Sequence, residues 1–117
     1  MPTTQINIEF GAMRPERALQ RVQTRFPGAS AQLRTSTYLD DQGVPQQTSV
    51  IVAVIPSTWL RFPLLDALYA LCQRFGQDCA GVRYFNGTGE LVGPRAAQWG
   101  AFNPEYFITY DDAIAQA

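Results

Sequence analysis

The chain has 117 residues, of which 46% are apolar and 16% charged, with a net charge of −1 at pH 7. This length fits one domain that can bury a sizeable core without a disulfide or a metal ion. The near-neutral balance lacks the basic excess that is typical of proteins that bind nucleic acid non-specifically. All nine positive residues are arginine, and histidine is absent. Ser-His-Asp and Cys-His catalytic groups are therefore excluded.

Two elements are predicted at the start of the chain. Residues 5–10 alternate apolar and polar side chains, which is typical of a strand with one buried face. Residues 15–26 repeat apolar side chains at helical spacing, and Pro15 suits the first helical position because its φ is already fixed near the helical value. Pro27 and Gly28 then end the predicted helix.

A hairpin is predicted next. Residues 30–39 and 46–55 both have the composition of strands, and a turn cluster at residues 40–43 separates them. The two strands are therefore expected to be antiparallel neighbours. Both faces of the second strand are apolar from Val50 to Ile55, so we expect this strand to be covered on both sides or to lie at the centre of a sheet.

The clearest signal in the chain is a helix predicted from Pro63 to Phe75. At about 100° per residue, its large apolar side chains fall within one arc of about 120°. Gly76 suits the end of this helix because glycine readily adopts the left-handed conformation found there. The arc consists of Leu64, Leu65, Leu68, Leu71, Cys72 and Phe75.

Shorter elements are predicted in the last third of the chain. Residues 80–85 and 90–92 read as strands, joined by a turn at residues 86–89. Residues 102–110 fit two structures, because Asn103 could cap a helix while the alternation of the segment favours a strand, which is our prediction. Residues 111–117 are predicted to form a short helical tail that frays.

The predicted order of elements, β-α-β-β-α-β, is that of the ferredoxin-like sandwich. We therefore expect an α+β fold in which two helices cover one face of an antiparallel sheet, with an extra C-terminal hairpin or strand. The whole chain, residues 1–117, is expected to form one domain. This order says little about activity, because the same fold has many unrelated functions.

Four arginines lie on the first predicted helix, within an arc of about 80° beside its apolar stripe. Two interpretations are open. These arginines could bind a partner, either an acidic protein surface or a phosphate chain. They could equally form the solvated face of an amphipathic helix. The set consists of Arg14, Arg17, Arg21 and Arg25.

Aromatic residues concentrate toward the C-terminus, in a segment of weak regularity. Tryptophan and tyrosine often anchor interfaces, so these residues are candidates for partner binding. Packing over the open face or the edge of the sheet is the alternative. The candidates are Trp99, Phe102 and Tyr106.

No metal or cofactor site is expected from the sequence. Cys72 and Cys79 are seven residues apart, unlike the close pairs of zinc and redox motifs. The aspartate pairs at residues 40–41 and 111–112 suit turns and helix caps without a cation. The glycine-containing run at residues 86–93 lacks the spacing and the ending of a phosphate-binding loop.

Two functions of different classes follow. The first reading is a non-enzymatic protein-interaction module, an adaptor or inhibitor that could be encoded by a mobile element, act on a host complex and associate with itself. Its partner would be another protein or a second copy, with nucleic acid a weaker third reading through arginine contacts and aromatic stacking. The second reading is a small-molecule-binding protein or enzyme of the dimeric α+β barrel type. Its cavity would lie between sheet and helices, lined by Tyr38, Tyr84, Tyr106 and Glu90.

The expected location of the protein is cytoplasmic. The N-terminal residues show no basic stretch followed by an apolar run, so no secretory signal is apparent. No apolar segment approaches the ~18 residues that a membrane helix requires, and a membrane partner is not expected.

Overall fold

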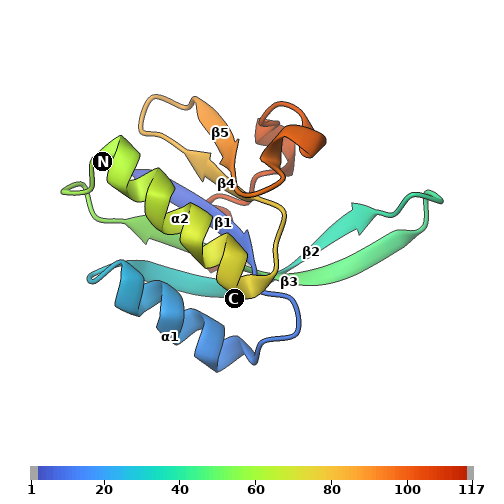
Figure 1. Ribbon diagram of the computed structural model, residues 1–117, viewed down its shortest axis with the longest axis horizontal. Coiled ribbons are helices and arrows are strands. Elements are labelled where there is room, and N and C mark those ends of the chain that lie inside the picture. Colours follow the sequence, from blue (N-terminus) through green and yellow to red (C-terminus); the bar gives the residue numbers. More distant parts are fainter. Residues whose placement is uncertain (1–2, 116–117) are drawn as a thin grey trace.

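The computed structural model describes residues 3–115, apart from the side chain of Tyr38. Figure 1 shows a single sheet with two long helices packed on one side of it. The elements are β1 (Thr4–Glu9), α1 (Pro15–Arg25), β2 (Ser30–Leu39), β3 (Pro45–Ile55), α2 (Arg61–Phe75), β4 (Ala80–Arg83), β5 (Gly89–Val92), η1 (Ala96–Trp99), η2 (Pro104–Tyr106) and α3 (Tyr110–Ala115).

The five strands form an antiparallel sheet in the order β2-β3-β1-β4-β5. β1 lies at the centre and pairs with β3 on one side and with β4 on the other. The first four strands have the ferredoxin-like arrangement, and β5 adds a further strand by forming a hairpin with β4. The predicted α+β fold is therefore confirmed.

The main core lies between the sheet and the helices α1 and α2. Ile6 and Ile8 of β1 belong to the same buried cluster as Val22 of α1 and Leu68 of α2. In the described part of the chain, apolar side chains fill this layer. A hollow on this side of the sheet lies at the edge of the layer beside Pro15 of α1, and Tyr84, Tyr106 and Glu90, which were predicted to line a cavity there, do not line it.

The opposite face of the sheet carries a second, smaller core. Val50 and Val52 of β3 are buried against Ala113 of α3, and Ile108 and Tyr110 pack beside them. Of the two situations predicted for residues 50–55, the structure has cover on both sides, whereas the centre of the sheet is β1. The C-terminal segment thus packs across the face that α1 and α2 leave free.

Helix α2 begins two residues before the predicted start, at Arg61. Pro63 therefore lies inside the first turn, where a backbone N–H has no partner within the helix and its absence costs little. The end of the helix is as predicted. Gly76 has a φ of 67°, and its N–H donates back to the carbonyl groups of Cys72 and Gln73.

The strand predicted at residues 102–110 does not form. Asn103 instead accepts a hydrogen bond from the N–H of Glu105 at 3.0 Å and begins the short helix η2. The chain then runs extended to α3, which contains residues 111–115 of the predicted tail. Residues 116 and 117 lie outside the described part.

The hairpin of β2 and β3 projects from the body, as Figure 1 shows at the right. The last pair between β1 and β3 joins Glu9 to Val50, whereas β2 and β3 remain paired from Thr35–Ser49 to Leu39–Pro45. We call residues 35–49 the arm. Among residues 3–115, no helix has the length and apolar character needed to cross a bilayer.

Candidate functional site

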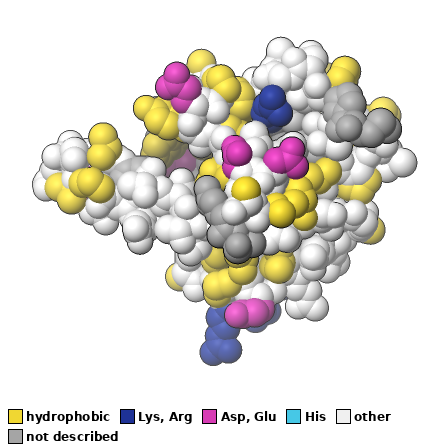
Figure 2. All heavy atoms as spheres, turned by 180° about the vertical axis from the view of Figure 1, so that it is seen from behind, with side chains coloured by type: hydrophobic (Ala, Val, Ile, Leu, Met, Phe, Trp, Pro, Cys, Tyr) yellow, Lys and Arg dark blue, Asp and Glu magenta, His cyan; other side chains and the backbone are white. Residues whose placement is uncertain are grey.

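A groove of about 910 Å³ lies on the face of the sheet opposite α1 and α2. Its floor is formed by β1, β3 and β4, one wall by the root of the arm, and the other wall by residues 99–108. Figure 2 views the molecule from this side and shows the hollow between the arm at the left and the C-terminal wall above it. A concave site of this size can hold a nucleoside-sized molecule.

Side chains of β1 hold the C-terminal wall in place. The side-chain amide of Asn7 donates to the carbonyl of Ile108 at 2.9 Å and accepts from its N–H at 2.8 Å. Gln5 accepts from the N–H of Tyr110 at 2.7 Å. The wall segment is thus extended, but its backbone pairs with side chains rather than with a neighbouring strand.

Aromatic rings form the inner surface of this wall. Phe102 and Phe107 pack with their ring centroids 5.6 Å apart. Glycines of β4 and β5 make room for them, because a Cβ at Gly89 would come within 2.4 Å of Phe102 and one at Gly81 within 3.3 Å of Phe107. At the rim, the indole N–H of Trp99 donates to Asp78 at 3.0 Å. The groove therefore has a pre-formed aromatic surface.

Glu9 is a half-buried carboxylate in the lining of this groove. Burial raises its pKa above the usual value, and a hydrogen bond with Thr48 opposes the shift. Burial also raises the pKa of the neighbouring Cys79, with further increases from Asp78 and Glu9. Cys79 therefore remains a thiol at neutral pH and is poorly suited to act as a nucleophile.

The charge of the groove limits the ligands that it can accept. Among the described residues in its lining, Glu9 and Glu105 are acidic and none is basic. An anionic phosphate would meet repulsion there, whereas a neutral or positively charged molecule would not. The part of the chain that the structure describes has no group of three or more histidine, cysteine, aspartate or glutamate residues placed to hold a metal ion.

The structure separates the two sets of predicted binding residues. Trp99, Phe102 and Tyr106 all line the groove. The arginines predicted for partner binding lie on α1 or, for Arg14, at its N-cap, and α1 packs on the other side of the sheet. The two sets therefore cannot form one site within a chain. The arginines are Arg14, Arg17, Arg21 and Arg25.

Two residues that matter most in the groove, Asn7 and Glu9, were not predicted as site residues. Both lie on the polar side of a strand that the sequence indicates to be half-buried. A signal was present, because the ferredoxin-like order puts the first strand at the centre of the sheet. Polar side chains on a central strand need partners or a cavity when both faces are covered.

Of the four residues predicted to line a cavity, two meet outside the groove. Tyr84 donates to Glu90 at 2.5 Å, and Arg61 of α2 binds the same carboxylate through two hydrogen bonds of 3.1 Å. This cluster ties the start of α2 to the β4-β5 hairpin. Tyr106 lies in the groove wall, and the side chain of Tyr38 is outside the described part.

The cluster predicts a loss of stability in alkaline solution. Burial and the contact with Glu90 raise the pKa of Tyr84 to about 12, from 10.0. The folded state therefore favours the neutral phenol, and its stabilising contribution is complete below pH 10 and lost as the pH rises to 12. We expect Tyr84→Phe to have a smaller drop in melting temperature between pH 9.5 and 11.5 than the wild type. Equal drops in both proteins would contradict this.

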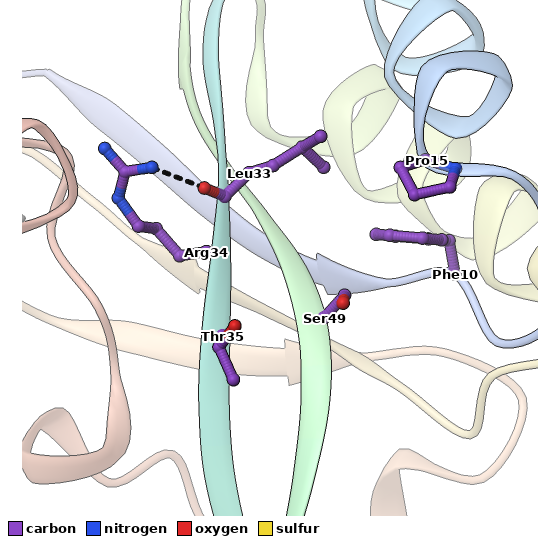
Figure 3. A pocket seen from close by; sticks show the side chains of 6 residues that line it. All are labelled: Phe10, Pro15, Leu33, Arg34, Thr35 and Ser49. Carbon is purple, nitrogen blue, oxygen red and sulfur yellow. Dashed lines mark hydrogen bonds between the residues drawn. The ribbon is translucent and has the colours of Figure 1, made fainter. Parts of the chain in front are cut away.

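A smaller hollow of about 350 Å³ lies at the root of the arm, on the side of α1. In Figure 3, Leu33 points toward Phe10 and Pro15, whereas the side chain of Arg34 lies on the other side of β2. Arg34 donates to the carbonyl of Leu33 and to that of Ala113. This hollow is open, and apolar and polar residues contribute to its lining in similar measure.

Comparison with known proteins finds a solved structure with a similar fold. No protein-family model matches the chain, and no curated protein is significantly similar to it in sequence. Among solved structures, the chain resembles a phage SAM lyase in complex with S-methyl-5'-thioadenosine. The TM-score is 0.57 at 13% sequence identity, and the match covers 77% of this chain and 87% of the lyase. The likeness is one of fold.

This comparison overturns the first reading of the sequence. That reading was a non-enzymatic protein-interaction module, an adaptor or inhibitor that could be encoded by a mobile element and act on a host complex. The matching fold instead belongs to an enzyme in complex with a small nucleoside. The second reading, a small-molecule-binding protein or enzyme, agrees better with this finding. The groove also lies on a different face of the sheet from the cavity that this reading expected.

Proposed function

We propose that this protein binds a small nucleoside without a phosphate group, such as S-methyl-5'-thioadenosine, in the groove opposite α1 and α2. The observation that carries the proposal is the half-buried carboxylate of Glu9 in a groove that has an aromatic wall and no basic side chain among its described lining residues. The fold shared with the SAM lyase supports the choice of ligand class.

The groove offers a partner for each part of such a ligand. A purine ring stacks well on aromatic side chains, and Phe102 and Phe107 present rings on one wall. Ribose hydroxyl groups or an amine can donate to Glu9, and hydrogen bonds to a charged acceptor are stronger than neutral ones. The polar root of the arm, with Thr35 and Thr37, faces the same space.

Titration calorimetry with four compounds tests the proposal. S-methyl-5'-thioadenosine and adenosine are expected to bind in the micromolar range, and adenosine monophosphate about tenfold more weakly or worse, because its phosphate meets Glu9 and Glu105. SAM is the fourth compound. Its incubation with the protein, followed by chromatography, shows whether S-methyl-5'-thioadenosine is released, which would indicate catalysis as well as binding.

The Glu9→Gln variant tests whether the carboxylate contributes to nucleoside binding independently of its effect on stability. We expect this variant to lose about tenfold in affinity for the nucleoside while melting at the same temperature as the wild type or higher. Because burial raises the pKa of Glu9, ionised Glu9 costs folding free energy at pH 7, and glutamine removes that cost. The gain in stability should vanish at low pH, where Glu9 is protonated in both the folded and the unfolded state.

Glu16→Gln is the matched control, because Glu16 is exposed on α1 and remote from the groove. It should bind the nucleoside like the wild type. The proposal fails if neither nucleoside binds at millimolar concentration, or if Glu9→Gln and Glu16→Gln bind equally well.

A further inference from the structure

The outer part of the arm has no covering element in the described part of the chain. Nearly all of its residues from Thr37 to Gln47 are exposed, and the large apolar side chains Leu39 and Val44 are 68% and 47% exposed. A two-stranded ribbon alone is only marginally stable in water. The arm would therefore gain stability by packing against another surface.

The tip of the arm is acidic, and hydrogen bonds within the turn order it. Asp40 accepts hydrogen bonds of 2.9 Å from the N–H groups of Gln42 and Val44, and a further one from the side chain of Gln46. The Val44 N–H bond in particular lowers the pKa of Asp40, so this carboxylate stays ionised. Asp41 is exposed beside it. A pre-ordered charged turn loses little conformational entropy when it binds.

A complementary surface lies on α1. Arg14 and Arg17 are exposed and Arg21 is half-buried, and we call these three residues the arginine face. Among the described residues, no carboxylate oxygen lies within 4.0 Å of a guanidinium nitrogen of these three arginines. The ion pair found there joins Arg61 to Glu90. Burial and the nearby charges of Arg74 and Arg17 lower the pKa of Arg21. The arginine face is thus a concentration of like charge.

Arg25 does not belong to this surface. Its guanidinium lies 5.4 Å from the centroid of the Trp59 ring, in a cation–π contact at the end of α1. Arg25 was predicted to act with the other three arginines, and the structure gives it a separate contact within the chain. Three arginines remain for an external partner.

We propose that the arm of one copy of this chain docks its acidic tip on the arginine face of a second copy. Within one chain the arm points away from α1, so the two surfaces cannot meet there (Figure 1). In a dimer with two-fold symmetry the same contact is made twice. Leu39 and Val44 would cover the aliphatic stems of the arginines.

Sedimentation velocity over a range of concentrations tests the docking in low and high salt. The wild type is expected to form a dimer that weakens in high salt, because exposed charges are screened there. Arg17→Glu and Asp41→Arg should each weaken association by about tenfold or more, and combining both changes should restore part of the affinity.

Arg95→Glu and Asp66→Arg are the matched controls, since both residues are exposed and belong to neither surface. They should associate like the wild type. Circular dichroism identifies any variant that fails to fold. If either Arg17→Glu or Asp41→Arg does not fold, the association of the other variant tests the proposal. A wild type that stays monomeric in low salt overturns the proposal. So does a dimer that is insensitive to both Arg17→Glu and Asp41→Arg. The result does not depend on nucleoside binding.

Discussion

Phe26→Ala is expected to lower the free energy of unfolding by about 3–5 kcal/mol. The side chain of Phe26 is fully buried, and its ring meets that of Trp59 edge-on with a centroid distance of 4.9 Å. Phe26 follows α1, and Trp59 lies in the loop before α2. Alanine would leave a cavity where these two parts of the chain meet, and packed surroundings relax only partly around such a cavity. Urea unfolding followed by circular dichroism measures the loss.

Tyr106→Ala provides the control for this prediction. Tyr106 is also aromatic, but it is 82% exposed in the groove wall, so its removal should change stability by no more than about 0.5 kcal/mol. A loss for Phe26→Ala as small as that for Tyr106→Ala would show that the contact with Trp59 is not part of the stable core. Comparing the stability losses of the two variants also distinguishes aromatic residues that stabilise the fold from those that are exposed to a ligand.

The fold could be predicted because the buried face of a helix or strand requires apolar residues at a regular spacing in the sequence. The apolar arc of α2 and the double-sided apolar pattern of β3 follow from which faces are covered, and both were recognisable without the structure. Residues 102–110 show where this reasoning fails. Their alternation reflects burial only in part, since Ile108 and Tyr110 pack on β3 whereas Tyr106 is exposed. The backbone, however, pairs with side chains of β1, which no local pattern reveals.

The candidate site was harder to predict than the fold. Its aromatic residues were recognised as binding candidates, but for a protein partner. Glu9 was not recognised, because a carboxylate at the end of an alternating strand looks like an ordinary solvated residue. Its role depends on distant segments, the arm and residues 99–108, that enclose it in three dimensions. Such a groove depends on tertiary packing, and sequence periodicity describes only local faces.

Asn7→Ala is expected to cost about 2–4 kcal/mol and to open the groove. The two hydrogen bonds between Asn7 and Ile108 join β1 to the C-terminal wall, and alanine would leave both the N–H and the carbonyl of Ile108 without these partners. Unpaired backbone groups away from water are costly, so the segment should move toward solvent. Urea unfolding measures the loss, and hydrogen exchange of a peptide containing residues 104–110 should speed up.

Two further variants show whether the wall or the global fold is affected. Asn7→Asp keeps an acceptor for the Ile108 N–H but loses the donor to its carbonyl, so it should fall between wild type and Asn7→Ala in both measurements. Asn86→Ala removes an amide side chain from the exposed β4-β5 turn, where its oxygen accepts hydrogen bonds from Thr88, and should leave exchange in the wall unchanged. If exchange at residues 104–110 stayed slow in Asn7→Ala, the hydrogen bond of Tyr110 with Gln5 and the packing on β3 would be sufficient to hold the wall. Because the wall carries the aromatic rings, an open wall should also weaken nucleoside binding even with Glu9 intact.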